Sequence, residues 1–173
     1  MKPHDVYIGL GSNLGDRVGY LRDAVMRLKT AGLGLEKVSR LYVAAPLGYV
    51  RDDAFINAAL HATTTLKPLD VLELLQRIEA DMGRRPGVQY GPRPIDLDIL
   101  FYDAVQIETR KLTIPHPRLA QRAFVLKPLA DIAPNLMHPV LYYTTSQLLQ
   151  DADDASQVQL YIPENQPARE QEC

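Results

Sequence analysis

Cysteine is almost absent from this chain of 173 residues: its single copy is Cys173, so no intrachain disulfide can form. Proteins without disulfides are typical of reducing compartments. The first residues carry no apolar stretch of the kind that a signal peptide needs, and no apolar run approaches the roughly 18 residues of a membrane-spanning helix. We therefore expect a cytoplasmic protein with no membrane partner.

An excess of charge of either sign is also lacking. Lysine and arginine number 19 against 21 aspartate and glutamate residues, which gives a net charge of −2. Broad nucleic-acid binding normally shows as a basic face, so we expect no nucleic-acid partner. A sheet that binds single-stranded RNA is the alternative, and it would need aromatic side chains on its strands. Nothing in the pattern indicates an obligate interface, so we expect a monomer.

The common nucleotide and zinc motifs are missing as well. No Gly-Lys-Ser/Thr follows the first glycines, which excludes a P-loop, and no cysteine and histidine residues have zinc spacing. Gly9, Gly11 and Gly15 resemble a dinucleotide fingerprint, but Leu14 stands where its third glycine belongs. A tight turn and a direct ligand contact remain equally good interpretations of these glycines.

The order of apolar patterns predicts an α+β fold. We expect one domain over residues 1–150 and a polar, flexible tail over 151–173. Strand, helix, strand, strand, helix, strand is the ferredoxin-like order, in which helices cover one face of a mainly antiparallel sheet. The strands are expected at 6–11, 38–44, 55–65 and 95–102, the helices at 18–28 and 68–82, short strands at 105–107 and 112–114, and further helices at 117–122 and 145–150.

Two carboxylates stand two residues apart on the last strand of this core. Because residues i and i+2 of a strand point to the same face, Asp96 and Asp98 share one face while Leu97 and Ile99 point to the other. Two carboxylates so close repel each other unless a cation joins them, and Mg²⁺ prefers such oxygen ligands. The alternative is an exposed pair on the solvated face of an edge strand.

The loop before this strand favours the metal site. Residues 82–95 are rich in glycine and proline, contain Arg84, Arg85 and Arg93, and include no acid. Long loops in compact domains are usually functional or disordered. Arginines facing a diacid strand are what phosphoryl transfer needs, because they hold the phosphates opposite the metal. The pair of features predicts metal–phosphate chemistry.

Several segments taken together resemble the 6-hydroxymethyl-7,8-dihydropterin pyrophosphokinase family. The most specific is Gly-Pro-Arg-Pro-Ile-Asp-Leu-Asp-Ile-Leu at 91–100. The others match in the same order over about residues 6–136, and they lie at 9–15, 46–48, 55–58, 76–79, 83–84, 115–118 and 122–126. The resemblance implies transfer of pyrophosphate from ATP to the pterin hydroxymethyl group, which gives AMP and a pterin diphosphate in folate biosynthesis.

The resemblance also implies a role for each matching residue. Asp96 and Asp98 would bind two Mg²⁺ ions that bridge the triphosphate, and Arg84 and Arg93 would promote transfer as catalytic residues. ATP would be bound by Gln76, Glu79, Arg84, Arg93, Ile99, Thr113, His116 and Arg122. The pterin would be bound by Pro46, Leu47, Phe55, Asn57 and Phe124, with the two aromatic rings on either side of it.

Some positions depart from the family pattern. Gln89 stands where a basic residue is usual, and the loop after Gly83 is about one residue short relative to some members. These changes affect the arginine loop and leave the two aspartates and Arg93 in place. The alternative they keep open is a homologue that binds nucleotide or pterin and catalyses weakly. Taken without the resemblance, Phe55 and Phe124 are ordinary core residues.

Overall fold

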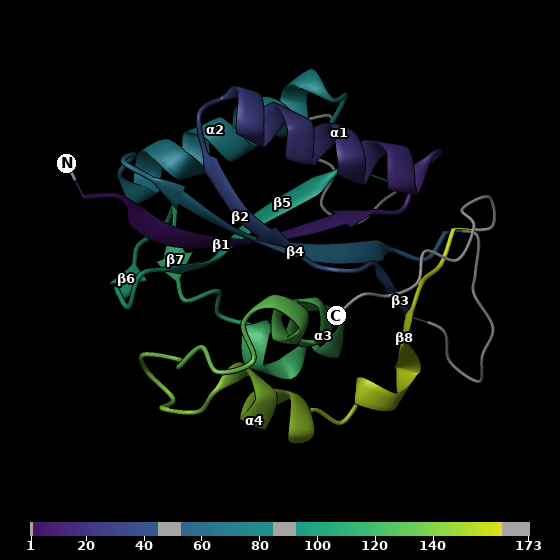
Figure 1. Ribbon diagram of the computed structural model, residues 1–173, viewed down its shortest axis with the longest axis vertical. Helices are drawn as coiled ribbons and strands as arrows, with labels where there is room; N and C mark the ends of the chain where they lie inside the picture. The colour runs from purple at the N-terminus through teal and green to yellow at the C-terminus, as the bar shows by residue number, and fades with distance from the viewer. Residues whose placement is uncertain (1, 45–52, 85–92, 164–173) are drawn as a thin grey trace.

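A computed structural model describes residues 2–44, 53–84 and 93–163, and these form one sheet with helices on both sides (Figure 1). The sheet has six strands in the order β5-β1-β4-β3-β8, and β2 also pairs with β4. The described strands of this sheet all pair antiparallel. The strands are β1 (His4–Ser12), β2 (Gly34–Val38), β3 (Tyr42–Ala44), β4 (Ile56–Thr64), β5 (Asp96–Tyr102) and β8 (Val158–Leu160), with a separate hairpin of β6 (Ile107–Glu108) and β7 (Thr113–Ile114).

The connection order confirms the ferredoxin-like prediction. Strand β1 is central, with β4 on one side and β5 on the other, as expected when two strand–helix–strand units interlock. The alternation of side chains along β1 explains its central place. Val6, Ile8 and Leu10 are buried against one layer of helices, while Gly9 and Gly11 face the other side of the sheet.

Helices α1 (Arg17–Thr30) and α2 (Pro68–Asp81) cover the first face of the sheet (Figure 1). Asp16 caps α1, because its side chain accepts a hydrogen bond from the backbone N of Gly19 at 3.0 Å. Pro68 opens α2, where its missing N–H costs nothing, and Gly83 follows the helix with a φ of +100°. Both predicted helices are confirmed: α1 extends the predicted range 18–28 at both ends, and α2 begins at the predicted residue and ends one residue before the predicted end.

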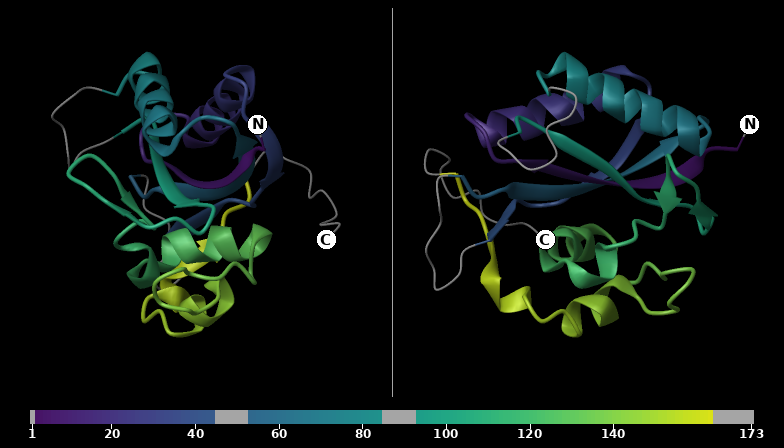
Figure 2. Two further views of the ribbon diagram at one scale, coloured as in Figure 1. Left: turned by 90° about the vertical axis from the view of Figure 1, so that its left-hand side faces the viewer. Right: turned by 180° about the vertical axis from the view of Figure 1, so that it is seen from behind.

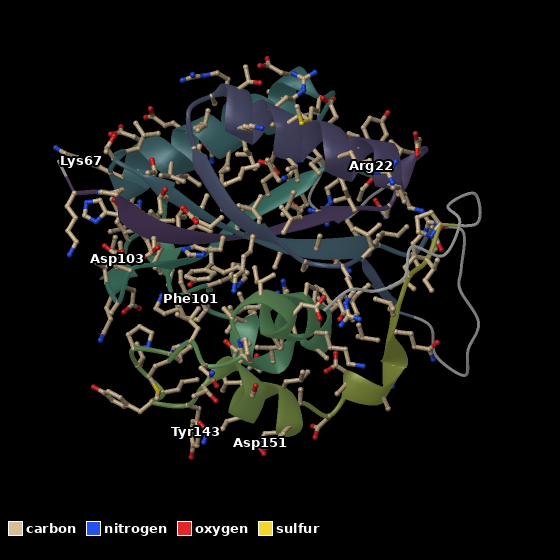
Figure 3. All side chains as sticks on the ribbon, viewed as in Figure 1. Arg22, Lys67, Phe101, Asp103, Tyr143 and Asp151 are labelled. Atoms are coloured by element: carbon tan, nitrogen blue, oxygen red, sulfur yellow. The ribbon has the colours of Figure 1, made fainter. Side chains whose placement is uncertain are left out.

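The opposite face is covered too, by α3 (Ala123–Ile132) and α4 (Thr145–Gln150), as the side view in Figure 2 shows. Phe101 is 1% exposed and lies between the sheet and α3 (Figure 3), where it packs with Leu126 and Leu129. We expected helices on one face only. Both faces are covered because the central strands are apolar on both sides, which requires a second layer.

Three other expectations about elements need correction. The strand expected at 38–44 is two strands, because Ser39 leaves the ladder and its Oγ accepts a hydrogen bond from the backbone N of Ala59 at 2.8 Å. The helix expected at 117–122 is a single 3₁₀ turn over Leu119–Gln121, and α3 begins directly after it. Helix α3 was not predicted because Pro128, a residue that normally breaks helices, lies inside it.

The segment expected as a flexible tail contributes a strand to the sheet. Val158–Leu160 form β8, which pairs with β3 and leaves Val158 2% exposed. The domain boundary at residue 150 stays a prediction. In the ranges that the structure describes, no helix is both long and apolar enough to cross a membrane.

A partly exposed ion pair joins the residues at the start of β3 to α3 and makes the stability depend on pH. The guanidinium of Arg40 donates to both oxygens of Asp131 at 2.9 and 2.6 Å, and the hydroxyl of Tyr42 donates at 2.8 Å. Burial raises the pKa of Asp131, but these hydrogen bonds outweigh it and hold the pKa below its usual value. Since the folded state binds this proton more weakly, the stabilisation is complete above the unfolded pKa of about 3.9 and is lost as the pH falls through the folded pKa.

We expect Asp131→Asn to lower the free energy of unfolding at pH 7 by about 1–2 kcal/mol, a reduced value because Arg40 is half exposed. When the free energy of unfolding is measured by urea denaturation between pH 2.5 and 7, it should also fall less steeply toward acid pH in the variant than in the wild type. Asp23→Asn, in the exposed pair with Arg27, is the matched control and should change stability by less than about 0.5 kcal/mol. Equal losses in both variants would contradict a special role for Asp131.

Candidate functional site

The pair of aspartates on β5 lies beside two glycines of β1. The register of these strands places Asp96 opposite Gly11 and Asp98 opposite Gly9. A Cβ at Gly11 would meet the Oδ1 of Asn57 at 3.0 Å and the ring of Phe55 at 3.3 Å, so a side chain here would displace both. Gly11 therefore leaves room for these two side chains, and Gly15, with a φ of +63°, has the conformation of a tight turn. Direct ligand contact by these glycines stays a prediction.

A cleft of about 190 Å³ opens over this part of the sheet. It brings together eight of the residues that the sequence predicts for the site: Phe55, Asn57, Arg93, Asp96, Asp98, His116, Arg122 and Phe124. They come from β4, β5, α3 and the segments before β5 and α3. Further lining is provided by Gly9, Leu10, Gly11, Ala58, Leu100 and Val125.

Arg84 joins two acidic groups at the edge of this cleft. Its Nη1 donates to Asp96 Oδ1 at 2.8 Å and makes a short contact with Glu79 Oε2. Glu79 is 6% exposed and also accepts a hydrogen bond from the backbone N of Leu97 at 3.0 Å. Burial nevertheless raises the pKa of Glu79 to about 7, because desolvation outweighs both donors. Glu79 therefore fixes Arg84 against β5.

Asp98 is the less compensated of the two carboxylates. Burial first, and then the negative charge of Asp96, raise its pKa to about 6, although Arg84, Arg122 and Arg93 act in the opposite direction. Within the described ranges, no group of three or more histidine, cysteine or carboxylate side chains is placed to hold a metal. The two aspartates thus offer oxygen ligands that favour an added cation, and the remaining ligands would come from water or phosphate.

Arg93 is held at the cleft by its backbone. Its N donates to Asn13 Oδ1 at 2.6 Å, and its O accepts from the backbone N of Asn13 at 3.2 Å. Its Nη1 lies 3.6 Å from Asp96 Oδ2, and its Nε is buried and finds no acceptor among the described residues. A buried donor without a partner favours an anionic ligand.

His116 and Arg122 border the cleft on the opposite side from Arg84. The backbone N of His116 donates to the O of Leu100 at 3.1 Å, and its Nδ1 accepts from the backbone N of Arg118 at 3.3 Å. Burial, then the charges of Arg122 and Arg118, lower the pKa of His116, so the ring is neutral at pH 7. With Nδ1 as acceptor, Nε2 carries the proton and is available as a donor.

The other end of the cleft is aromatic. The guanidinium of Arg93 lies 5.3 Å from the ring centre of Phe55, and that of Arg122 lies 5.6 Å from that of Phe124. Asn57 is 8% exposed, and its Nδ2 donates to the O of Phe55 at 3.4 Å. A flat ring with amide-like groups is the ligand that such an end suits.

The remaining predicted residues lie elsewhere. Gln76 is on the exposed side of α2, Ile99 is 4% exposed in the core beneath the helices, and Thr113 lies in β7. Pro46 and Leu47 are outside the described residues. The role of Asn13 was not predicted, because its partner is 80 residues away; the available signal was Gly-Ser-Asn at the end of β1.

Comparisons with known proteins agree with this geometry. The model of the 7,8-dihydro-6-hydroxymethylpterin-pyrophosphokinase (HPPK) family matches residues 7–134. The chain is 49% identical over 127 residues to the 2-amino-4-hydroxy-6-hydroxymethyldihydropteridine pyrophosphokinase of Bacillus subtilis, which covers 73% of this chain and 76% of the relative. The corresponding protein of Aquifex aeolicus is 41% identical over 135 residues, 78% of this chain and 84% of the relative.

Longer proteins match over one part of their length. The mitochondrial folate synthesis bifunctional protein of Arabidopsis thaliana is 47% identical over 75% of this chain, and the match spans 23% of that protein. A crystal structure of Plasmodium falciparum HPPK-DHPS with pteroate has the same fold, with a TM-score of 0.68 and 17% identity over 86% of this chain and 42% of that one. The family model and these relatives define the class of protein, and the fold is that of the solved structure. The chain belongs to the HPPK family.

The hydrogen bond from Arg93 to Asn13 can be tested by amide exchange. In Asn13→Ala the backbone N–H of Arg93 loses its acceptor, so we expect hydrogen exchange at Arg93 to become at least about tenfold faster. Asn13→Asp keeps an acceptor oxygen and should retain most of the protection. The measurement is hydrogen exchange by NMR at pH 7. Unchanged exchange in Asn13→Ala would contradict this role of Asn13.

Proposed function

We propose that this protein transfers the pyrophosphoryl group of ATP to the hydroxymethyl group of 6-hydroxymethyl-7,8-dihydropterin, which gives AMP and the pterin diphosphate. The observation that carries the proposal is one cleft with two different ends. One end has carboxylates and arginines, which suit a metal-bound polyphosphate, and the other has two phenylalanines and an asparagine, which suit a pterin ring. Such a cleft brings the two substrates together.

The ATP phosphates would lie between the arginines and β5. Arg93 offers a buried Nε without an acceptor, and Arg84 is fixed by Glu79 next to Asp96. Arg122 and the neutral His116 would hold the phosphates from the other side. Gln76, Ile99 and Thr113 would contribute to the nucleotide side, a role that the family resemblance supports and the cleft lining does not include.

Asp96 and Asp98 would hold two Mg²⁺ ions. The residues fit this cation, since both ligands are hard oxygens on one face of β5, and burial together with the charge of Asp96 raises the pKa of Asp98, a charge that a cation would offset. When bound, such ions neutralise phosphate charge and stabilise both the attacking and the leaving oxygen. The contribution of the chain is to keep the two carboxylates in register against Gly9 and Gly11.

The pterin would lie between Phe55 and Phe124, with its amide-like edge toward Asn57. Pro46 and Leu47 would complete this end from outside the described residues. The hydroxymethyl oxygen then attacks the β-phosphorus in line, and the bond from that phosphorus to the oxygen bridging the α-phosphate breaks. AMP leaves with the bridging oxygen, and the hydroxyl proton passes to solvent. Positioning and charge neutralisation are sufficient for this step.

The remaining proposals concern the cellular compartment and the oligomeric state. We propose action in the cytoplasm as a monomer, supported by the near-neutral charge and the single cysteine of the sequence. The names of some relatives, such as the Arabidopsis protein, include the word mitochondrial.

Product analysis is the direct test of the function. The protein mixed with ATP, Mg²⁺ and 6-hydroxymethyl-7,8-dihydropterin should release AMP and pterin diphosphate in equal amounts, and EDTA should abolish both. ADP as the product would instead indicate an ordinary kinase. Binding of both ligands without AMP release would favour the alternative, a homologue that binds and does not catalyse.

The metal site is tested by removing one charge without changing shape. In Asp98→Asn we expect kcat to fall at least about 100-fold, because the weaker ligand cannot hold the cation that stabilises the transition state. The melting temperature should stay the same or rise, since a neutral amide is buried at less cost than a carboxylate. Asp81→Asn, at the exposed end of α2, is the control. Turnover near that of the wild type in Asp98→Asn would overturn the assignment.

A further inference from the structure

The segment 154–161 contacts the chain next to both aromatic walls of the cleft, although it lies beyond the residues that the family model matches. We propose that this segment is a positioning element for the pterin site, with Asp154 placing Phe124 and Tyr161 placing Phe55. The proposal deepens the proposed function and rests on it. It assigns a specific role to residues that the sequence predicts to be a tail.

The first aromatic wall of the cleft is Phe124, which lies in the opening turn of α3. Arg122 begins this helix without providing a side-chain cap, so the first backbone N–H groups need acceptors from elsewhere. Asp154 supplies one: its Oδ1 accepts from the N of Ala123 at 3.3 Å, and its negative charge lies at the positive end of the helix. Phe124 is the next residue along the chain.

The same turn is also weakened from within the helix. Pro128 has no N–H, so the carbonyl of Phe124 has no helical hydrogen-bond donor four residues later. The opening turn keeps its own hydrogen bonds from the backbone N of Val125 and of Leu126 to the O of Arg122, each at 3.0 Å, and contacts from outside α3 add to them. Beyond Asp154, these are the Nζ of Lys127, which donates to the O of Val158, and the packing of Val158 against Ala123.

The second aromatic wall is Phe55, and Arg17 connects Tyr161 to the residue that precedes it. The guanidinium of Arg17 lies 5.8 Å from the ring centre of Tyr161, within the range of a cation–π contact. Its Nη1 donates to the O of Ala54 at 2.7 Å, and Ala54 directly precedes Phe55. Tyr161 is itself fixed, because its backbone N donates to the O of Leu41 at 2.8 Å.

Together, these contacts would determine the spacing between the rings of Phe55 and Phe124. Strand β8 is paired with β3, so the segment is tied to the sheet between its two points of contact (Figure 1). The ATP end of the cleft has its own supports, since Glu79 fixes Arg84 and Asn13 fixes Arg93. Of the residues proposed to hold the phosphates, Arg122 lies at the turn that Asp154 caps. Loss of the segment's contacts should therefore weaken pterin binding more than nucleotide binding.

The test measures the affinities of the two substrates separately in the full chain. Isothermal titration calorimetry gives the Kd of the pterin in the presence of Mg²⁺ and a non-hydrolysable ATP analogue, and the Kd of the analogue alone. In Asp154→Ala we expect the pterin Kd to rise about three- to tenfold, the size of effect that loss of a helix cap produces, with the analogue Kd changed less than about twofold. Tyr161→Leu keeps the apolar bulk without the aromatic face and should raise the pterin Kd about two- to threefold.

Two further variants make the result specific. Asp154→Asn keeps an oxygen that accepts from Ala123, so it should restore pterin affinity to near the wild-type value. Asp153→Ala, at the exposed neighbouring position, should behave as the wild type. A lower melting temperature in Asp154→Ala with an unchanged pterin Kd, or an equal loss of both affinities, would overturn the proposal. Wild-type protein that neither binds pterin nor releases AMP would overturn the proposed function instead, and this outcome is seen before any variant is compared.

Discussion

The repulsion between two carboxylates on one face of β5 is the constraint on which the site depends. The strand alternation that buries Leu97 and Ile99 in the core forces Asp96 and Asp98 into the cleft, whatever the cost in desolvation. Arg84 and Arg93 compensate Asp96 directly, whereas Asp98 keeps a raised pKa. The folded protein is thus electrostatically incomplete at this point, and a divalent cation arriving with its phosphates is what would complete it.

The same arginines connect the two ends of the cleft. Arg93 lies next to Asp96 and also over the ring of Phe55, and Arg122 has the same relation to Phe124. In the proposed complex, each guanidinium would border the phosphates as well as a ring that faces the pterin. Movement of either arginine on phosphate binding would be felt by the aromatic pair, which provides a physical basis for coupling between the two substrates.

Much of this arrangement follows from local pattern. The two-residue period of β5 predicts which side the aspartates share, and Asp16, Pro68 and Gly83 mark helix ends by local chemistry. What could not be predicted depends on contacts between distant residues or on elements that contradict propensity. Helix α3 contains a proline, which normally breaks helices, and β8 is a three-residue strand in a mostly polar stretch that pairs with the edge of β3.

The central place of β1 has a consequence for synthesis. It is synthesised before its partners, which are Thr64 opposite His4 in β4 and Tyr102 opposite Val6 in β5. Until β5 has been made, the strand that will carry both glycines of the site has at least one edge without hydrogen bonds. Nascent chains of intermediate length therefore expose an apolar, unpaired strand, and the cleft forms only when β5 closes that edge.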